Sequence, residues 1–192
     1  MSGSAWQRRS QAARTTDARF VSAARHALSI VLLPGTVVVV VPALTVWAYD
    51  SVSVGWGLAD GLAALPVVAG VALLGVGGLL VAWTVALFAR VGRGTLAPWN
   101  PTTRLVVLGP YRHVRNPMIS GVLFLLLGEA ALLGSIPLLL LFAAVAAVNA
   151  VYLPLVEEPG LMRRFGGEYE RYRENVPRWV PRLRPWEGQP PP

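Results

Sequence analysis

Cysteine is absent from the 192-residue sequence, and so is lysine. Without cysteine, the chain has no disulfides, no thiolate metal ligands and no cysteine nucleophile. The only histidines are His26 and His113, and no cluster of ligand side chains accompanies either, so we expect no metal ion. Charged residues are also scarce, at 14% of the chain. A soluble domain has about 25% charged residues, so this scarcity argues against a soluble protein.

Apolar residues fill the space that the charges leave, with 54% hydrophobic residues and a mean hydropathy of +0.52. About 20 apolar residues span the hydrocarbon core of a bilayer as a helix. Four segments are near or above that length: about Ala27 to Trp47, Leu62 to Ala89, Pro117 to Leu133, and Ile136 to Leu155. The sequence therefore predicts an all-α, integral membrane bundle of about four transmembrane helices. A fifth, re-entrant helix within 95–108 is the alternative.

Two short features refine this bundle. The third and fourth segments are joined only by the short stretch Gly134 to Pro137, which predicts a tight helical hairpin. The basic N-terminus resembles a signal peptide, but the apolar run behind it is long and lacks a clear cleavage site, so we expect a retained first span.

The 17 arginines predict the orientation of the bundle. Five precede the first span, five lie between the second and third, and seven follow the fourth, whereas the other two loops contain only Asp50 and Asp60. Because arginine-rich loops stay in the cytoplasm, we expect both termini and the loop from Val91 to Asn116 there. This role accounts for the net charge of +7, so we expect membrane lipids and no nucleic acid as partners.

Beyond the fourth span, the sequence predicts one amphipathic helix on the cytoplasmic membrane surface. Four apolar side chains share its inner face: Leu161, Phe165, Tyr169 and Tyr172. Gly166 and Gly167 weaken this helix in the middle. Trp179 and Trp186 in the following tail are expected to anchor at the interface.

A polar pocket is expected where the hairpin opens toward the cytoplasm. The turn from Tyr111 to Asn116 directly precedes Pro117, which suits the first position of a helix. Glu157 and Glu158 end the fourth span, so the hairpin brings them close to this turn. Arginines and free helix N–H groups favour an anion, and paired carboxylates favour a cation or a ribose diol. S-adenosylmethionine carries all of these groups.

The stretches "GPYRHVRNPMISG", "EE" and "FGGEYERYRENVPRWVPR" together resemble a family of membrane methyltransferases. This family includes isoprenylcysteine carboxyl methyltransferases and phospholipid N-methyltransferases. The resemblance covers roughly Pro101 to Arg184 and leaves the first two spans without a comparable signature. It implies an enzyme that binds S-adenosylmethionine in a cytoplasm-facing pocket and methylates a lipophilic small molecule or lipid. It also implies an integral protein of a bacterial plasma membrane.

Matching this sequence to the family motifs implies roles for individual residues. Arg115 and Glu158 become the catalytic candidates, for substrate alignment or proton handling. Arg115 or Arg178 would orient a carboxylate acceptor, and a glutamate would take the proton of an amine. Two positions depart from the usual pattern, since Asn116 replaces a common histidine and Ile119 replaces a tyrosine. The cofactor-binding candidates are Tyr111, His113, Asn116, Pro117, Gly121 and Glu157.

The expected domains are a basic cytoplasmic segment (1–25), N-terminal transmembrane helices (26–90), a methyltransferase core (91–186) and a disordered tail (187–192). Two alternatives stay open. In the first, the chain is a non-enzymatic scaffold or anionic-lipid-binding protein whose arginines contact lipid headgroups. In the second, Glu157 and Glu158 only cap the following helix. Glu129 lies near the outer end of the third span, where we expect it to snorkel, so we exclude it from the site. The sequence leaves the methyl acceptor and the oligomeric state open.

Overall fold

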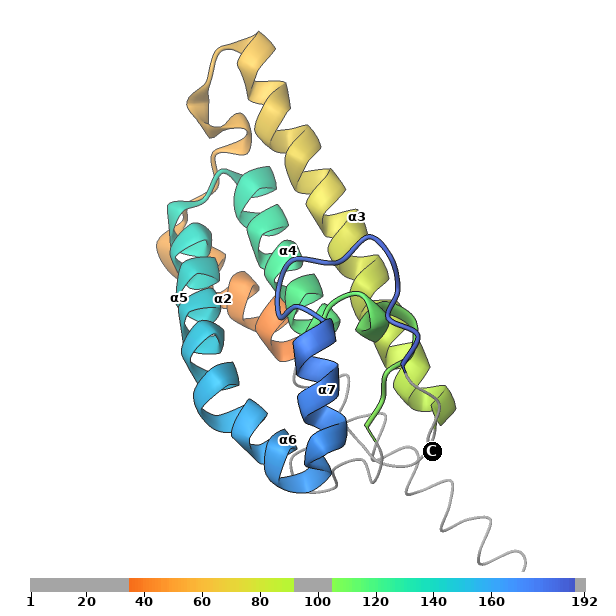
Figure 1. The fold of residues 1–192 in the computed structure, drawn as a ribbon. Helices are drawn as coiled ribbons and strands as arrows, with labels where there is room; N and C mark the ends of the chain where they lie inside the picture. Colours follow the sequence, from red (N-terminus) through yellow and green to blue (C-terminus); the bar gives the residue numbers. More distant parts are fainter. Residues whose placement is uncertain (1–34, 92–104, 189–192) are drawn as a thin grey trace, which may run out of the picture.

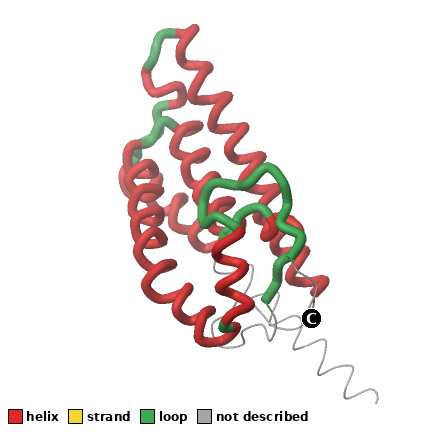
Figure 2. Tube along the Cα trace, viewed as in Figure 1, coloured by secondary structure: helices red, strands yellow, loops and turns green. Residues whose placement is uncertain are grey.

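The computed structural model describes residues 35–91 and 105–188, and these residues form helices and loops only (Figures 1 and 2). The α-helices are α2 (Val41–Tyr49), α3 (Asp60–Val91), α4 (Pro117–Leu133), α5 (Ile136–Tyr152), α6 (Glu158–Phe165) and α7 (Gly167–Asn175). Short helical segments of other types are η1 (Thr36–Val40), η2 (Val54–Gly57), η3 (Gly109–Arg112) and η4 (Leu153–Glu157).

Three helical stretches are long and apolar enough to cross a membrane: Thr36–Gly57, Gly61–Phe88 and Ile136–Phe165. The shorter apolar helix Pro117–Leu133 packs among them. The expected all-α membrane bundle is therefore confirmed. The start of the first expected span and most of the alternative fifth helix lie outside the described residues, and residues 105–108 form no helix.

Helices α3 and α4 pack along two pairs of facing glycines. A Cβ on Gly77 would lie 2.7 Å from the carbonyl oxygen of Gly121, and one on Gly128 would lie 3.0 Å from that of Gly70. The members of each pair are seven residues apart on their helices, so both pairs lie on one line of contact. We call this line the glycine seam. It lets the two backbones approach closely and fixes where α4 begins relative to α3.

The tight hairpin between α4 and α5 is confirmed. Gly134 ends α4 with a φ of 61°, and the Ser135 hydroxyl accepts a hydrogen bond from the Leu138 N–H at 3.4 Å. The loop before α3 covers this hairpin, because the Ser53 N–H donates to the Leu133 carbonyl at 2.9 Å. A side chain at Gly134 has no room there, since its Cβ would overlap the Ser53 carbonyl oxygen.

Helix α5 continues into α6 through the π-helical segment η4, where the Glu158 N–H donates to the Leu153 carbonyl, five residues earlier. Pro154 and Pro159 each lack an N–H, which favours such a local widening of the helix. The alternative that Glu157 and Glu158 cap a new helix is wrong, because α6 follows η4 without a break and has no side-chain cap.

The prediction of a single amphipathic helix after the fourth span is also wrong. Gly166, with a φ of 51°, separates α6 from α7, and α7 turns back toward the bundle (Figure 1). Tyr169 and Tyr172 are consequently buried with Val176 instead of facing the membrane. Trp186 packs against this cluster, with its ring centroid 5.8 Å from that of Tyr172. Its ring is therefore held by the protein and is not a free anchor in the membrane interface.

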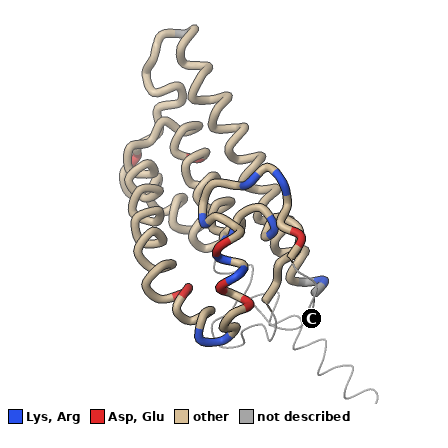
Figure 3. The backbone as a smooth tube through the Cα atoms, in the orientation of Figure 1, with Lys and Arg blue, Asp and Glu red and all other residues tan. Residues whose placement is uncertain are grey.

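Charged residues gather at one end of the bundle (Figure 3). This end holds the last turn of α3, the turn before α4, helices α6 and α7, and the C-terminal segment. The opposite end, with the α4–α5 hairpin and η2, is mostly apolar. The charge separation expected from the sequence is therefore present along the described chain.

Candidate active site

The polar turn before α4 rests on the end of α3. Its 3₁₀ segment, η3, includes the buried Pro110, and a Cβ on Gly109 would lie 3.2 Å from Trp83 Nε1. The Tyr111 ring meets the Phe88 ring edge to face, with centroids 5.7 Å apart at an interplanar angle of 89°. Aromatic contacts of this geometry are favourable, so α3 fixes the position of the turn.

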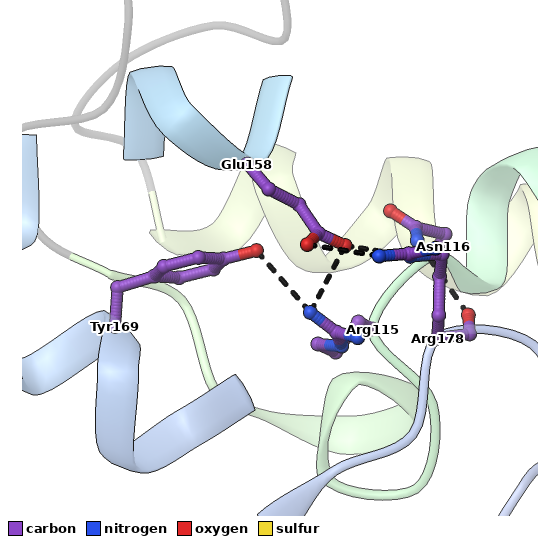
Figure 4. A network of polar contacts seen from close by, with 5 residues as sticks. All are labelled: Arg115, Asn116, Glu158, Tyr169 and Arg178. Carbon is purple, nitrogen blue, oxygen red and sulfur yellow. Dashed lines mark hydrogen bonds and ion pairs between the residues drawn. The ribbon is translucent and has the colours of Figure 1, made fainter. Parts of the chain in front are cut away.

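Glu158 lies at the centre of an ionic network at the charged end (Figure 4). Arg178 binds both of its carboxylate oxygens, through Nε at 2.6 Å and Nη2 at 3.0 Å. Arg115 Nη1 donates to the same carboxylate at 3.0 Å and to the Tyr169 hydroxyl at 3.4 Å. The side chains of Arg115 and Glu158 are each only 10% exposed, so this network is largely shielded from water.

Residues 177–186, which we call the C-terminal strap, bring Arg178 to this network. The strap pairs with the turn through its backbone: the Arg115 N–H donates to the Pro177 carbonyl at 2.9 Å, and the Arg182 N–H donates to the His113 carbonyl at 3.0 Å. His113 Nδ1 lies 2.8 Å from the Arg182 carbonyl oxygen, so this ring nitrogen donates. The strap and the turn are therefore held as one unit.

A second group of contacts ties the end of the strap down. The Trp186 N–H donates to the Arg112 carbonyl at 2.9 Å, and Arg112 Nε donates to the Trp186 carbonyl at 2.8 Å. The Tyr172 hydroxyl donates to the Tyr111 carbonyl at 2.8 Å. Helix α7 and the strap thus both hold the turn.

Burial raises the pKa of Tyr111 above its ordinary value, and the nearby Glu157 carboxylate adds to this effect. Burial also raises the pKa of Tyr172. Both phenols therefore stay protonated at neutral pH and act as hydrogen-bonding groups, not as bases. For Arg178, the hydrogen bond to Glu158 raises the pKa above its ordinary value, so its charge is permanent.

One buried donor of the site has no partner among the described residues: Arg115 Nε. Burying an unsatisfied donor on a charged group is costly, so such an atom points to a binding role. The network also holds two guanidinium groups against one carboxylate, and this leaves a positive charge. Both observations suit an anionic ligand group at Arg115.

The structure brings the two catalytic candidates together, as the hairpin predicted. Asn116 lies at the edge of the network, with Nδ2 donating to the Arg178 carbonyl at 3.5 Å, and Pro117 begins α4. His113 holds the strap. Gly121 lies elsewhere, in the glycine seam, where its Cβ would meet Gly77. Glu157 is close enough to Tyr111 for its charge to affect that phenol.

Sequence reasoning missed how the far end of the chain completes the site. The sequence predicts only that Arg178 orients an acceptor, whereas in the structure it forms two hydrogen bonds with Glu158. The sequence also predicts Tyr169 and Tyr172 on the membrane surface, whereas in the structure they contact Arg115 and the turn. The signal was present, since both tyrosines and Arg178 lie in the stretch that carried the family resemblance.

The fold and this site define an integral membrane helical protein with a buried ionic network at its charged end. The family model described as phospholipid methyltransferase matches residues 65–168, which is more than half of the chain. The chain therefore belongs to the phospholipid methyltransferase family. The match begins within α3, so it extends farther toward the N-terminus than the motif resemblance did. Methyltransferases of this family use S-adenosylmethionine.

Among curated proteins, the chain is similar to Protein-S-isoprenylcysteine O-methyltransferase of Schizosaccharomyces pombe. The two are 38% identical over 82 residues, which cover 43% of this chain and 35% of that protein. The matched region thus spans about a third of the relative's length. No solved structure matches the chain.

Proposed function

We propose that this protein transfers a methyl group from S-adenosylmethionine to a lipophilic acceptor at the cytoplasmic face of a membrane. The observation that supports this most is the shielded network of Arg115, Glu158 and Arg178, found in a chain of a methyltransferase family. It lies where the hairpin opens, beside helices that face lipid. An acceptor dissolved in the bilayer would reach it laterally.

The residues present fit this cofactor. The free Nε of Arg115 and the excess positive charge suit its carboxylate. Glu157 suits its ribose hydroxyls or ammonium group, and the rings near the turn suit adenine stacking. When bound, the cofactor supplies a methyl group already activated by a sulfonium. The chain therefore has to bind, orient and exclude water more than it has to activate.

Glu158 is better suited to positioning than to proton transfer. Three N–H donors from Arg115 and Arg178 already occupy its two oxygens. It would keep both guanidinium groups in place, and Arg178, with a side chain 30% exposed, could then bind a carboxylate acceptor. An amine acceptor would instead lose its proton to Glu157, for which the structure shows no arginine partner among the described residues.

Calorimetry with S-adenosylhomocysteine on the detergent-purified protein tests this proposal. We expect binding by the wild type and at least about tenfold weaker binding by Arg115→Lys, because lysine keeps the charge but loses the forked donors. Arg173→Lys, on the exposed side of α7, is the matched control and should bind like the wild type. A wild type that does not bind would favour the alternative of a non-enzymatic scaffold or anionic-lipid-binding protein.

The acceptor is found in a separate experiment. Active protein is incubated with methyl-labelled cofactor and a membrane lipid extract, and the labelled product is identified by mass spectrometry. Label that appears only with the wild type, and not with Arg115→Lys, supports methyl transfer at this site.

A further inference from the structure

The C-terminal strap carries apolar side chains that the protein itself leaves uncovered. Leu183 is 98% exposed and Val180 is 75% exposed. Both lie between arginines, with Arg182 and Arg184 on either side of Leu183. The strap is nevertheless fixed, because the Arg182 N–H is bonded to His113 and Arg182 Nη1 donates to the Asn175 carbonyl at 2.7 Å. Its tip is therefore presented in a defined position.

The length of α4 indicates how deep in the membrane the strap lies. This helix has 17 residues, so it is about 25 Å long and shorter than a hydrocarbon core of about 30 Å. Helix α3, with 32 residues, is about 48 Å long and extends beyond the core. The turn that precedes α4 consequently lies at the edge of the hydrocarbon and not out in the water. The strap is bonded to this turn, and in the view of Figure 1 it runs across α3 and α4.

Two exposed aromatic residues also indicate that the turn and the strap lie at the membrane interface. Trp83, 56% exposed, lies at the level of the turn, because a Cβ on Gly109 would touch its indole nitrogen. Tyr152, 47% exposed, ends α5 shortly before Glu158. Tryptophan and tyrosine concentrate where a membrane meets water, so both place the interface close to the site.

We infer that the strap tip, residues 180–184, inserts into the leaflet on the site's side and binds anionic phospholipid. Val180 and Leu183 would enter the acyl boundary, and Arg182 and Arg184 would contact the phosphates. The charge pattern selects this partner, since apolar side chains between arginines match a surface of apolar chains under anionic headgroups. The inference rests on the membrane character of the chain, so its failure would leave the proposed methyl transfer intact.

The absence of cysteine allows a direct test with the 192-residue chain. Leu183→Cys and Val180→Cys are each labelled with an environment-sensitive fluorophore and reconstituted into phosphatidylcholine vesicles with about a third phosphatidylglycerol. We expect blue-shifted emission, and quenching by lipids spin-labelled high on the acyl chain that exceeds the control by about twofold or more. The control is Glu168→Cys, on the exposed side of α7.

Removing the charge tests lipid selectivity in the same vesicles. Arg184→Gln in the Leu183→Cys background, or vesicles of phosphatidylcholine alone, should reduce lipid quenching by about half. If both strap labels are quenched by aqueous iodide as strongly as Glu168→Cys, insertion is wrong. If quenching is the same with and without phosphatidylglycerol, the proposed recognition of anionic lipid is wrong.

Discussion

At the scale of single residues, Glu158 decides whether the site holds together. It is nearly buried and connects Arg115, from the turn before α4, to Arg178, from the strap. Two guanidinium groups close together repel each other, and the shared carboxylate compensates for this. A buried charge left without its partner is costly, whereas an exposed ion pair contributes little.

Glu158→Gln should therefore destabilise the protein by about 3 kcal/mol, because it leaves two guanidinium groups without a counter-charge. The thermal unfolding midpoint in detergent measures this effect. Glu168→Gln makes the same chemical change at an exposed position and should leave the midpoint unchanged. Equal midpoints for the two variants would mean that the network does not stabilise the fold.

The raised pKa of Tyr111 predicts how the free energy of unfolding changes at high pH. Its pKa is raised in the folded protein, whereas the unfolded chain loses this proton near pH 10. Above about pH 10 the unfolded state thus binds fewer protons, and the free energy of unfolding falls by about 1.4 kcal/mol per pH unit for this group. Tyr111→Phe should remove that part of the decline. Denaturation at several pH values measures the slope, and an unchanged slope in Tyr111→Phe would contradict the raised pKa of this phenol.

At the scale of elements, the glycine seam sets the distance between α3 and α4. Gly70 and Gly77 on α3 face Gly128 and Gly121 on α4 so closely that backbone oxygens occupy the space of a Cβ. This contact aligns the turn before α4 with Phe88 and Trp83 on α3. A shift of the seam would be passed on to the turn, because α4 begins immediately behind it.

Gly77→Ala should force the two helices apart and destabilise the protein by about 1–3 kcal/mol, since its methyl group would lie 2.7 Å from the Gly121 oxygen. The matched control is Gly75→Ala on the same helix, where nothing lies within 4 Å. That change should be neutral or slightly stabilising, because alanine favours helix over glycine. Unfolding in increasing denaturing detergent, followed by circular dichroism, compares the two. Similar losses of stability in both would contradict the seam.

Local signals in the sequence were sufficient to predict α4. Pro117 at its start and Gly134 behind its end mark Pro117–Leu133, and the hairpin then implies that Arg115 lies near Glu158. The break at Gly166 was harder to predict, because the apolar spacing continues across it and only tertiary packing decides that Tyr169 turns inward. The catalytic role of Arg115 and Glu158 stays a prediction.

At the scale of the whole molecule, the site depends on contacts between distant parts of the chain. His113 and Arg182 are 69 residues apart in sequence, and they meet through hydrogen bonds that leave no periodic pattern in the side chains. The pairing of the strap with the turn could therefore not be predicted from hydropathy. What the positions of the arginines along the chain did predict is the separation of charge, with arginine-bearing elements at one end of the bundle (Figure 3).

This separation predicts the orientation of the whole protein, with the site in the cytoplasm and the η2 loop on the other side. Single cysteines can report it, since the chain has none of its own. Val54→Cys, at a residue 63% exposed, should react with a membrane-impermeant maleimide on intact cells. Glu168→Cys, on α7, should react only after the membrane is permeabilised. The reverse labelling pattern would place the arginine-rich end outside, where cytosolic S-adenosylmethionine could not reach the site, and it would contradict the proposed function together with the orientation.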